Sequence, residues 1–110
     1  MINVSIKKNG EDIVSVEVEG HAYYDVSGKD IVCSAVSAIT QTALEGIEYF
    51  SKSKVKKEIN EKRGFLKFVL PEPKEEQEKI QVQAIVKAME IGLKDLESGF
   101  KSHLKVEVKL

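Results

Sequence analysis

The polarity pattern of the chain changes its period within residues 14–36, which read VSVEVEGHAYYDVSGKDIVCSAV. Apolar and polar side chains alternate up to Gly20, and this period of two predicts a strand with one buried face. From about Asp30 to Phe50 the apolar residues recur every three or four positions, as they do in a helix. Residues 21–29 lie between these patterns and are expected to form a loop. The stretch therefore predicts a strand, a short loop and a long helix that pack together.

The segments on either side of this stretch supply the rest of the fold. Residues 2–6 alternate in polarity, and an Asn9-Gly10 turn joins them to the next strand as a hairpin. Further along, the sequence predicts strands over 55–59, 65–70 and 104–110 and a second helix over 74–98. The order β-β-α-β-β-α-β lacks strict βαβα alternation, which predicts an α+β fold. We expect a single domain over residues 1–110, with one sheet packed against two helices in an unspecified strand order.

The composition limits the classes of function. The chain has 110 residues, of which 42% are hydrophobic, so one domain can build a core. Its 17 basic and 18 acidic residues give a net charge of −1, whereas a general nucleic-acid binder usually carries a basic excess. No segment resembles a signal peptide, and no apolar run approaches the roughly 18 residues that span a bilayer. We therefore expect a cytoplasmic protein that binds neither nucleic acid nor membrane directly.

The cysteine and histidine content argues against a bound metal. The chain has one cysteine and two histidines, and they show neither CxxC nor HxxxH spacing. A lone cysteine suits a reducing compartment, where it can act as a catalytic thiol. The glycine-rich patterns GxxxxGK and GxGxxG, which cradle phosphates, are absent. The sequence therefore predicts no metal and no other cofactor.

The position of Cys33 on the first helix carries the functional interpretation. On a helical wheel that starts from Ile31, the predicted core side holds Ala35, Ile39, Thr42, Ala43 and Gly46, with Val32 and Phe50 close by. Cys33 falls on a separate stripe with Ser37, Thr40 and Leu44. A cysteine that only fills the core should sit in the middle of the apolar arc. This one is predicted to lie off the core, in the first helical turn.

That location has chemical consequences. The first turn of a helix offers unpaired backbone N–H groups and partial positive charge, which favour a thiolate and can meet an oxyanion. Asp30, the predicted N-cap, opposes the thiolate by its charge, but a nearby protonated histidine would outweigh it. Closure of the loop would bring His21 beside Cys33, and such a pair is the minimum apparatus for thiol catalysis. Gly20 and Gly28 let the backbone bend around this site.

Each candidate residue also has a structural interpretation. A lone cysteine is more often an inert core filler, and a histidine at a strand end is more often a surface residue. Tyr23 can clamp a ligand or pack on the body of the protein, and Ser37 can touch a ligand or simply face solvent. Asp30 can orient His21, although capping of the helix is the favoured interpretation. His103, which precedes the last strand, is interpreted as structural.

Residues 20–37 resemble the signature of a known family. Gly20-His21-Ala22, followed after a short loop by residues 28–37 with the sequence GKDIVCSAVS, is similar to the signature of the bacterial ribosomal-processing cysteine proteases, the Prp family. The resemblance extends over the whole chain in length and element order. Residues 54–110 match only in general character.

The resemblance implies an activity that spacing alone does not show. Members of this family remove a short N-terminal extension from a bacterial large-subunit ribosomal protein, cutting after a hydrophobic stretch that ends in aromatic residues. It also implies a Cys–His dyad, here Cys33 as nucleophile and His21 as base, a homodimer, and a loop that moves when peptide binds. The other expected site residues are Ser37 and Tyr23 as substrate contacts and Gly20, Gly28 and Asp30 as supporting residues.

Two other classes of function remain open. A non-enzymatic module that binds peptides or assists ribosome assembly fits the small size, the exposed strand edges and the lack of a third catalytic residue. A thiol-dependent transferase or hydrolase of small molecules would use the same Cys–His chemistry. Alkylation separates the first from a protease, because fast labelling at pH 6 that is lost in His21→Ala favours the protease.

The second helix is apolar around most of its circumference. One arc holds Ile80, Ala84, Ala88 and Ile91, and another holds Val82, Ile85, Val86, Met89, Leu93 and Leu96. The polar arc is expected to be exposed and narrow, with Gln83, Lys87, Glu90 and Lys94. Such a helix is buried on more than one side. Either the sheet and the first helix cover it, or a second copy does so in a homodimer.

Overall fold

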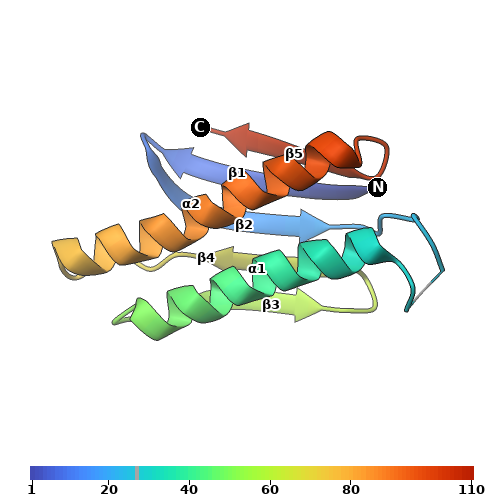
Figure 1. Ribbon diagram of the computed structural model, residues 1–110. Helices are drawn as coiled ribbons and strands as arrows, with labels where there is room; N and C mark the ends of the chain where they lie inside the picture. The colour runs from blue at the N-terminus through green and yellow to red at the C-terminus, as the bar shows by residue number, and fades with distance from the viewer. Residues whose placement is uncertain (27) are drawn as a thin grey trace.

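A computed structural model shows a five-stranded sheet with both helices packed on one of its faces (Figure 1). It describes residues 1–26 and 28–110, so Ser27 of the predicted loop lies outside the described residues. The elements are β1 (Ile2–Asn9), β2 (Asp12–Glu19), α1 (Ile31–Phe50), β3 (Lys56–Asn60), β4 (Phe65–Val69), α2 (Glu76–Gly99) and β5 (Leu104–Lys109). The predicted α+β class and element order are confirmed, and the boundaries move by only a few residues.

The strand order is β3-β4-β2-β1-β5. β1 and β2 form an antiparallel hairpin, and Gly10 in its turn has a φ of +64°, which glycine adopts without strain. β5 runs parallel to β1, and α2 provides the crossover that this pairing requires. Because β2 is antiparallel to both β1 and β4, its end lies beside the start of each of these strands. These strand ends and the start of α1 surround the candidate site.

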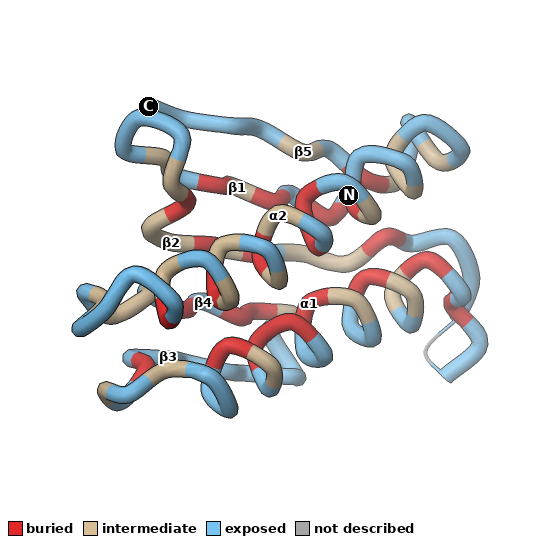
Figure 2. The backbone as a smooth tube through the Cα atoms, turned by 60° about the vertical axis from the view of Figure 1, so that its left-hand side comes forward, coloured by how far each residue is buried: buried red, intermediate tan, exposed pale blue. Residues whose placement is uncertain are grey.

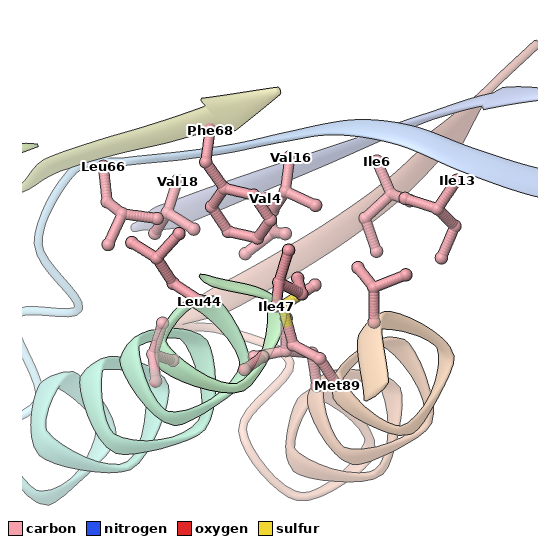
Figure 3. Close-up of a cluster of buried hydrophobic side chains, with 14 of the residues drawn as sticks. Val4, Ile6, Ile13, Val16, Val18, Leu44, Ile47, Leu66, Phe68 and Met89 are labelled. Atoms are coloured by element: carbon pink, nitrogen blue, oxygen red, sulfur yellow. The ribbon is translucent and has the colours of Figure 1, made fainter. Parts of the chain in front are cut away.

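The core lies between the sheet and the two helices. Alternate strand residues point toward the helices, where they meet side chains such as Leu44, Ile47 and Met89 (Figure 3). The fully buried sheet residues include Val4, Ile6, Ile13, Val16 and Phe68. Burial of each such side chain stabilises the fold by about 1.5–3 kcal/mol. Figure 2 shows that burial is concentrated in β1, β2, β4 and the inner sides of the two helices, while β3 is exposed throughout.

The buried face of α1 differs from the predicted one. Its buried residues are Val32, Val36, Thr40, Ala43, Leu44 and Ile47. The assignment of Thr42 and Phe50 to the core side is therefore wrong, as is the placement of Thr40 and Leu44 away from it. The wheel started from Ile31, which is 56% exposed, and α1 packs against both the sheet and α2, so its buried face is rotated. Cys33 consequently lies half-buried at the edge of the core, not well away from it.

Helix α2 buries the predicted inner residues Val82, Val86, Met89 and Leu93. Ile80 and Ile91 are exposed, and the predicted exposure of Glu90 is wrong because this residue is buried. Its carboxylate forms ion pairs of 3.1 Å with Lys8 and 2.8 Å with Lys94, which offset its desolvation. Among the described residues, neither helix has the length and apolar character that crossing a membrane requires.

Candidate active site

An open pocket of about 470 Å³ lies where β2 ends and α1 begins. Its walls come from the loop between these elements, the first turns of α1 and the turn that joins β3 to β4. The lining includes every site residue predicted from the sequence, namely Gly20, His21, Tyr23, Gly28, Asp30, Cys33 and Ser37. Loop closure has therefore gathered the whole predicted set around one cavity.

Cys33 presents its thiol to this pocket from the first turn of α1. The backbone N–H of Ala22 donates a hydrogen bond to Sγ, with 3.4 Å between nitrogen and sulfur. The sulfur therefore has a backbone donor directed at it from the loop. The residue directly after the predicted histidine base thus already contacts the predicted nucleophile.

The His21 imidazole lies against the β3–β4 turn. Its Nε2 is 3.3 Å from the carbonyl oxygen of Lys62. Because a carbonyl can only accept, this contact assigns the hydrogen to Nε2 and leaves the Nδ1 lone pair of the neutral ring available. Across residues 1–26 and 28–110, no hydrogen bond joins His21 to Cys33. The two side chains share the pocket, and the ring would have to move before it could accept a proton from sulfur.

Gly64 makes room for this histidine. It has a φ of +66°, and a Cβ at this position would lie 2.9 Å from Cε1 of His21 and 2.5 Å from the carbonyl oxygen of Gly20. Only glycine therefore fits between the ring and the end of β2. The sequence predicts a turn at residues 61–64 but gives no signal for its contact with His21, because sheet pairing creates that contact.

Asp30 caps α1 as predicted and also ties down the loop. Its Oδ1 accepts from the N–H groups of Val32 and Cys33 at 3.0 Å each, and its Oδ2 accepts from Tyr24 at 2.9 Å and Asp25 at 3.3 Å. Burial alone would raise the pKa of this carboxyl, but the four backbone donors outweigh burial and lower it. The helix-start donors expected to meet an oxyanion are thus already bonded to Asp30.

Asp30→Asn is expected to reduce the free energy of unfolding by about 2 kcal/mol at pH 7, because an amide nitrogen cannot accept two of these bonds. The lowered pKa means that the contribution of Asp30 is complete above the unfolded-state pKa of about 4 and is lost as the pH falls from there through the lower folded-state pKa. Denaturant unfolding at pH 7 and at pH 3 measures this difference. The exposed Asp95→Asn is the control, and an equal gap between wild type and Asp30→Asn at both pH values would contradict the prediction.

The two adjacent tyrosines of the loop differ in their surroundings. Tyr23 is 76% exposed, has a strained φ of +55° and meets the His21 ring edge-on at a centroid distance of 6.0 Å. Tyr24 packs instead against Phe100 and His103, with centroid distances of 5.5 and 5.2 Å. Tyr23 is therefore free to contact a ligand in the pocket, whereas Tyr24 fastens the loop to the turn before β5.

The site has the features of a thiol-dependent hydrolase. A free cysteine with a backbone donor and a histidine with an available ring nitrogen face one open cavity. Nowhere in the described part of the chain do three histidine, cysteine, aspartate or glutamate side chains gather as a metal site needs. Fold and site together define a small α+β hydrolase with a cysteine and a histidine on one open pocket.

The family model named Cysteine protease Prp matches residues 1–105. The chain belongs to the cysteine protease Prp family, so the predicted membership and enzyme class are confirmed.

Several relatives match along almost the whole chain. The ribosomal processing cysteine protease Prp of Bacillus subtilis (strain 168) is 26% identical over 111 residues, covering 100% of this chain and 99% of its own. The crystal structure of an essential ribosomal processing protease Prp from S. aureus, with a covalently linked product peptide, superposes with a TM-score of 0.87 at 23% identity. This match covers 99% of this chain and 100% of that one. A Streptococcus mutans protein gives a TM-score of 0.83 at 24% identity, with 99% and 94% coverage.

Proposed function

We propose that this protein is an endopeptidase that removes the N-terminal extension of a bacterial large-subunit ribosomal protein, with Cys33 as nucleophile and His21 as base. The observation that carries the proposal is the placement of both residues on one open pocket, where Sγ already accepts a backbone N–H. Family membership supports the chemistry, and the names of the relatives refer to ribosomal processing.

The reaction follows from the two side chains. His21 takes the thiol proton on Nδ1, and Sγ of Cys33 attacks the scissile carbonyl carbon while the π electrons move to oxygen. When the carbonyl re-forms, the C–N bond breaks and the leaving amine takes the proton from His21. Water then attacks the thioester while His21 takes one of its protons, the C–S bond breaks to release the acid product, and His21 returns that proton to sulfur. For this step the His21 ring would leave the Lys62 carbonyl and turn Nδ1 toward the thiol.

The substrate class is supported by the walls of the pocket. Beside the thiol, the sheet contributes the apolar residues Ile2, Val18, Ile59, Phe65 and Leu66. Such a surface stabilises apolar side chains of a bound peptide, in keeping with a cut that follows a hydrophobic stretch. We place Tyr23 and Ser37 in contact with the peptide, since both line the same cavity and both are exposed.

Mass spectrometry of the ribosomal precursor before and after exposure to the enzyme tests this proposal. We expect one cleavage near the N-terminus of the precursor, after apolar and aromatic residues. Enzyme alkylated with iodoacetamide is a matched control, because Cys33 is the only cysteine in the chain. An intact precursor, or cleavage that survives alkylation, would contradict the proposal. Binding of the precursor without cleavage would instead support a peptide-binding or ribosome-assembly module.

We further propose a homodimer formed through the outer surface of α2. Ile80 and Ile91 are 61% and 69% exposed, and Ala84 and Ala88 between them are exposed as well. A stripe of this kind on a small protein is typical of a protein–protein contact. We place the dimer in the cytoplasm, where a free thiol stays reduced.

Sedimentation velocity tests the dimer. Ile91→Lys is expected to convert a dimer to a monomer, because a charge would be buried in the contact. Val108→Lys is the matched control, since Val108 is an exposed apolar residue on β5 and not on α2. A wild-type monomer would rule the dimer out, and dissociation by Val108→Lys alone would place it on another surface.

A further inference from the structure

His103 lies on a rigid support next to the candidate site. It belongs to the turn between α2 and β5, its backbone N–H donates to Phe100 at 2.9 Å, and its carbonyl accepts from the N–H of Ile2 at 2.9 Å. These bonds fix the residue to the start of β1. Its ring nitrogen Nδ1 donates to the carbonyl oxygen of Ala22 at 2.9 Å. This contact spans 81 positions of the chain.

Ala22 is held at three points. Its carbonyl accepts from His103, its N–H donates to Sγ of Cys33 at 3.4 Å, and its side chain is only 2% exposed. Fixing the groups on both sides of one Cα fixes both backbone torsions of the residue. The direction of the Ala22 N–H therefore depends on the bond from His103.

The other candidate donors near the sulfur are already bonded. The N–H groups of Val32 and Cys33 donate to the Asp30 carboxylate, whose charge makes these bonds strong. The Ala22 N–H, by contrast, already points at the reacting atom. When a thiolate attacks a carbonyl, its negative charge moves to an oxygen two bonds away. A donor that is aimed at sulfur can follow the charge to that oxygen with a small shift.

We propose that the backbone N–H of Ala22 stabilises the oxyanion formed during cleavage and that His103 is a positioning residue that holds it. The proposal rests on the proposed function, in which Cys33 Sγ bonds to the scissile carbonyl carbon and the π electrons pass to oxygen. The Ala22 N–H then leaves sulfur, which is no longer charged, and donates to the oxyanion. His103 touches no reacting atom in this step.

Packing of His103 against Tyr24 is the competing explanation, because it would also fix the loop. Asparagine and leucine separate the two explanations. They have the same branched shape, both lack the ring, and only asparagine places an N–H donor where Nδ1 of histidine lies. A difference between the two variants therefore reports the hydrogen bond and not the packing.

The experiment compares His103→Leu and His103→Asn in cleavage of the ribosomal precursor. We expect His103→Leu to lower kcat by roughly 10- to 100-fold with KM changed less than about threefold, and His103→Asn to recover at least tenfold of kcat. Alkylation of Cys33 by iodoacetamide at pH 6 should also slow by about fivefold in His103→Leu, but much less in His103→Asn.

Three outcomes would overturn the proposal. These are wild-type kcat in His103→Leu, equal losses in the two variants, or a loss confined to KM. Melting temperatures show whether the two variants fold equally well. Cleavage by Cys33→Ala would defeat the proposed function itself. Should the wild type leave the precursor intact, the alkylation rates still decide whether His103 holds the Ala22 N–H on the sulfur.

Discussion

Cys33→Ala is expected to abolish cleavage of the ribosomal precursor, lowering kcat by roughly 10⁴-fold or more. The methyl group cannot form the thioester, so the pocket would only bind the peptide and orient it. Cys33→Ser is expected to be nearly as inactive, because a hydroxyl stays protonated at neutral pH and histidine alone activates it poorly in a site built for sulfur. Initial rates of precursor cleavage, followed by mass spectrometry, measure both losses.

Two controls keep the result specific to the thiol. Thr42→Ala changes an exposed residue of the same helix, outside the pocket lining, and should cleave at the wild-type rate. Thermal unfolding should show that Cys33→Ala remains folded, because the side chain is only half-buried and few contacts are lost. If Cys33→Ala cleaved the precursor as fast as wild type, the thiol would have no part in the reaction.

His21→Ala is expected to lower kcat by roughly 10²- to 10⁴-fold, the usual contribution of a general base. Without the imidazole, no ring nitrogen can take the thiol proton or return it to the leaving amine. Because the pocket is open, added imidazole should reach the vacated space and restore part of the rate. Rates at neutral pH with and without imidazole make the measurement, and an undiminished rate in His21→Ala would exclude this residue as the base.

The contact between Gly64 and the His21 ring gives an independent check. Gly64→Ala keeps the imidazole but places a methyl group 3.0 Å from its Nε2, so the ring must shift and kcat should fall. Gly10→Ala is a matched control, since Gly10 has a φ of +64° against +66° for Gly64 and, apart from its chain neighbours, no atom of the described residues lies within 4 Å of the added carbon. Both variants place alanine at a similar positive φ, so a greater loss of kcat in Gly64→Ala reports the contacts of the added methyl group with the His21 ring and the Gly20 carbonyl oxygen.

Local patterns predicted most of the fold. The alternation in β1 and β2 and the helical spacing after Asp30 show which side of each element faces the core. Both patterns can be recognised from the order of neighbouring residues alone. The predicted rotation of α1 is wrong because α1 contacts two neighbours, the sheet and α2, which the spacing of its own residues does not locate. The burial of Glu90 was missed for a similar reason, since its partner Lys8 comes from another element.

The candidate site divides in the same way. His21 and Cys33 end and begin two elements joined by one loop, so their meeting at a single pocket could be predicted from the sequence. The N-cap role of Asp30 was also local, but its bonds to Tyr24 and Asp25 depended on the path of the loop. The sequence of the loop alone does not predict which groups form hydrogen bonds with His21, Cys33 and Asp30.

The sequence by itself therefore determined the element order, the thiol at the start of a helix and the histidine at the end of a strand, because these depend on neighbours within a few residues. The tertiary structure alone decided that Gly64 seats the His21 ring and that His103 reaches Ala22 across 81 positions. Both contacts arise where β5 pairs with β1 and where β4 pairs with β2, and strand pairing follows from packing of the whole sheet. No local pattern of residues encodes which distant turn will lie beside which loop.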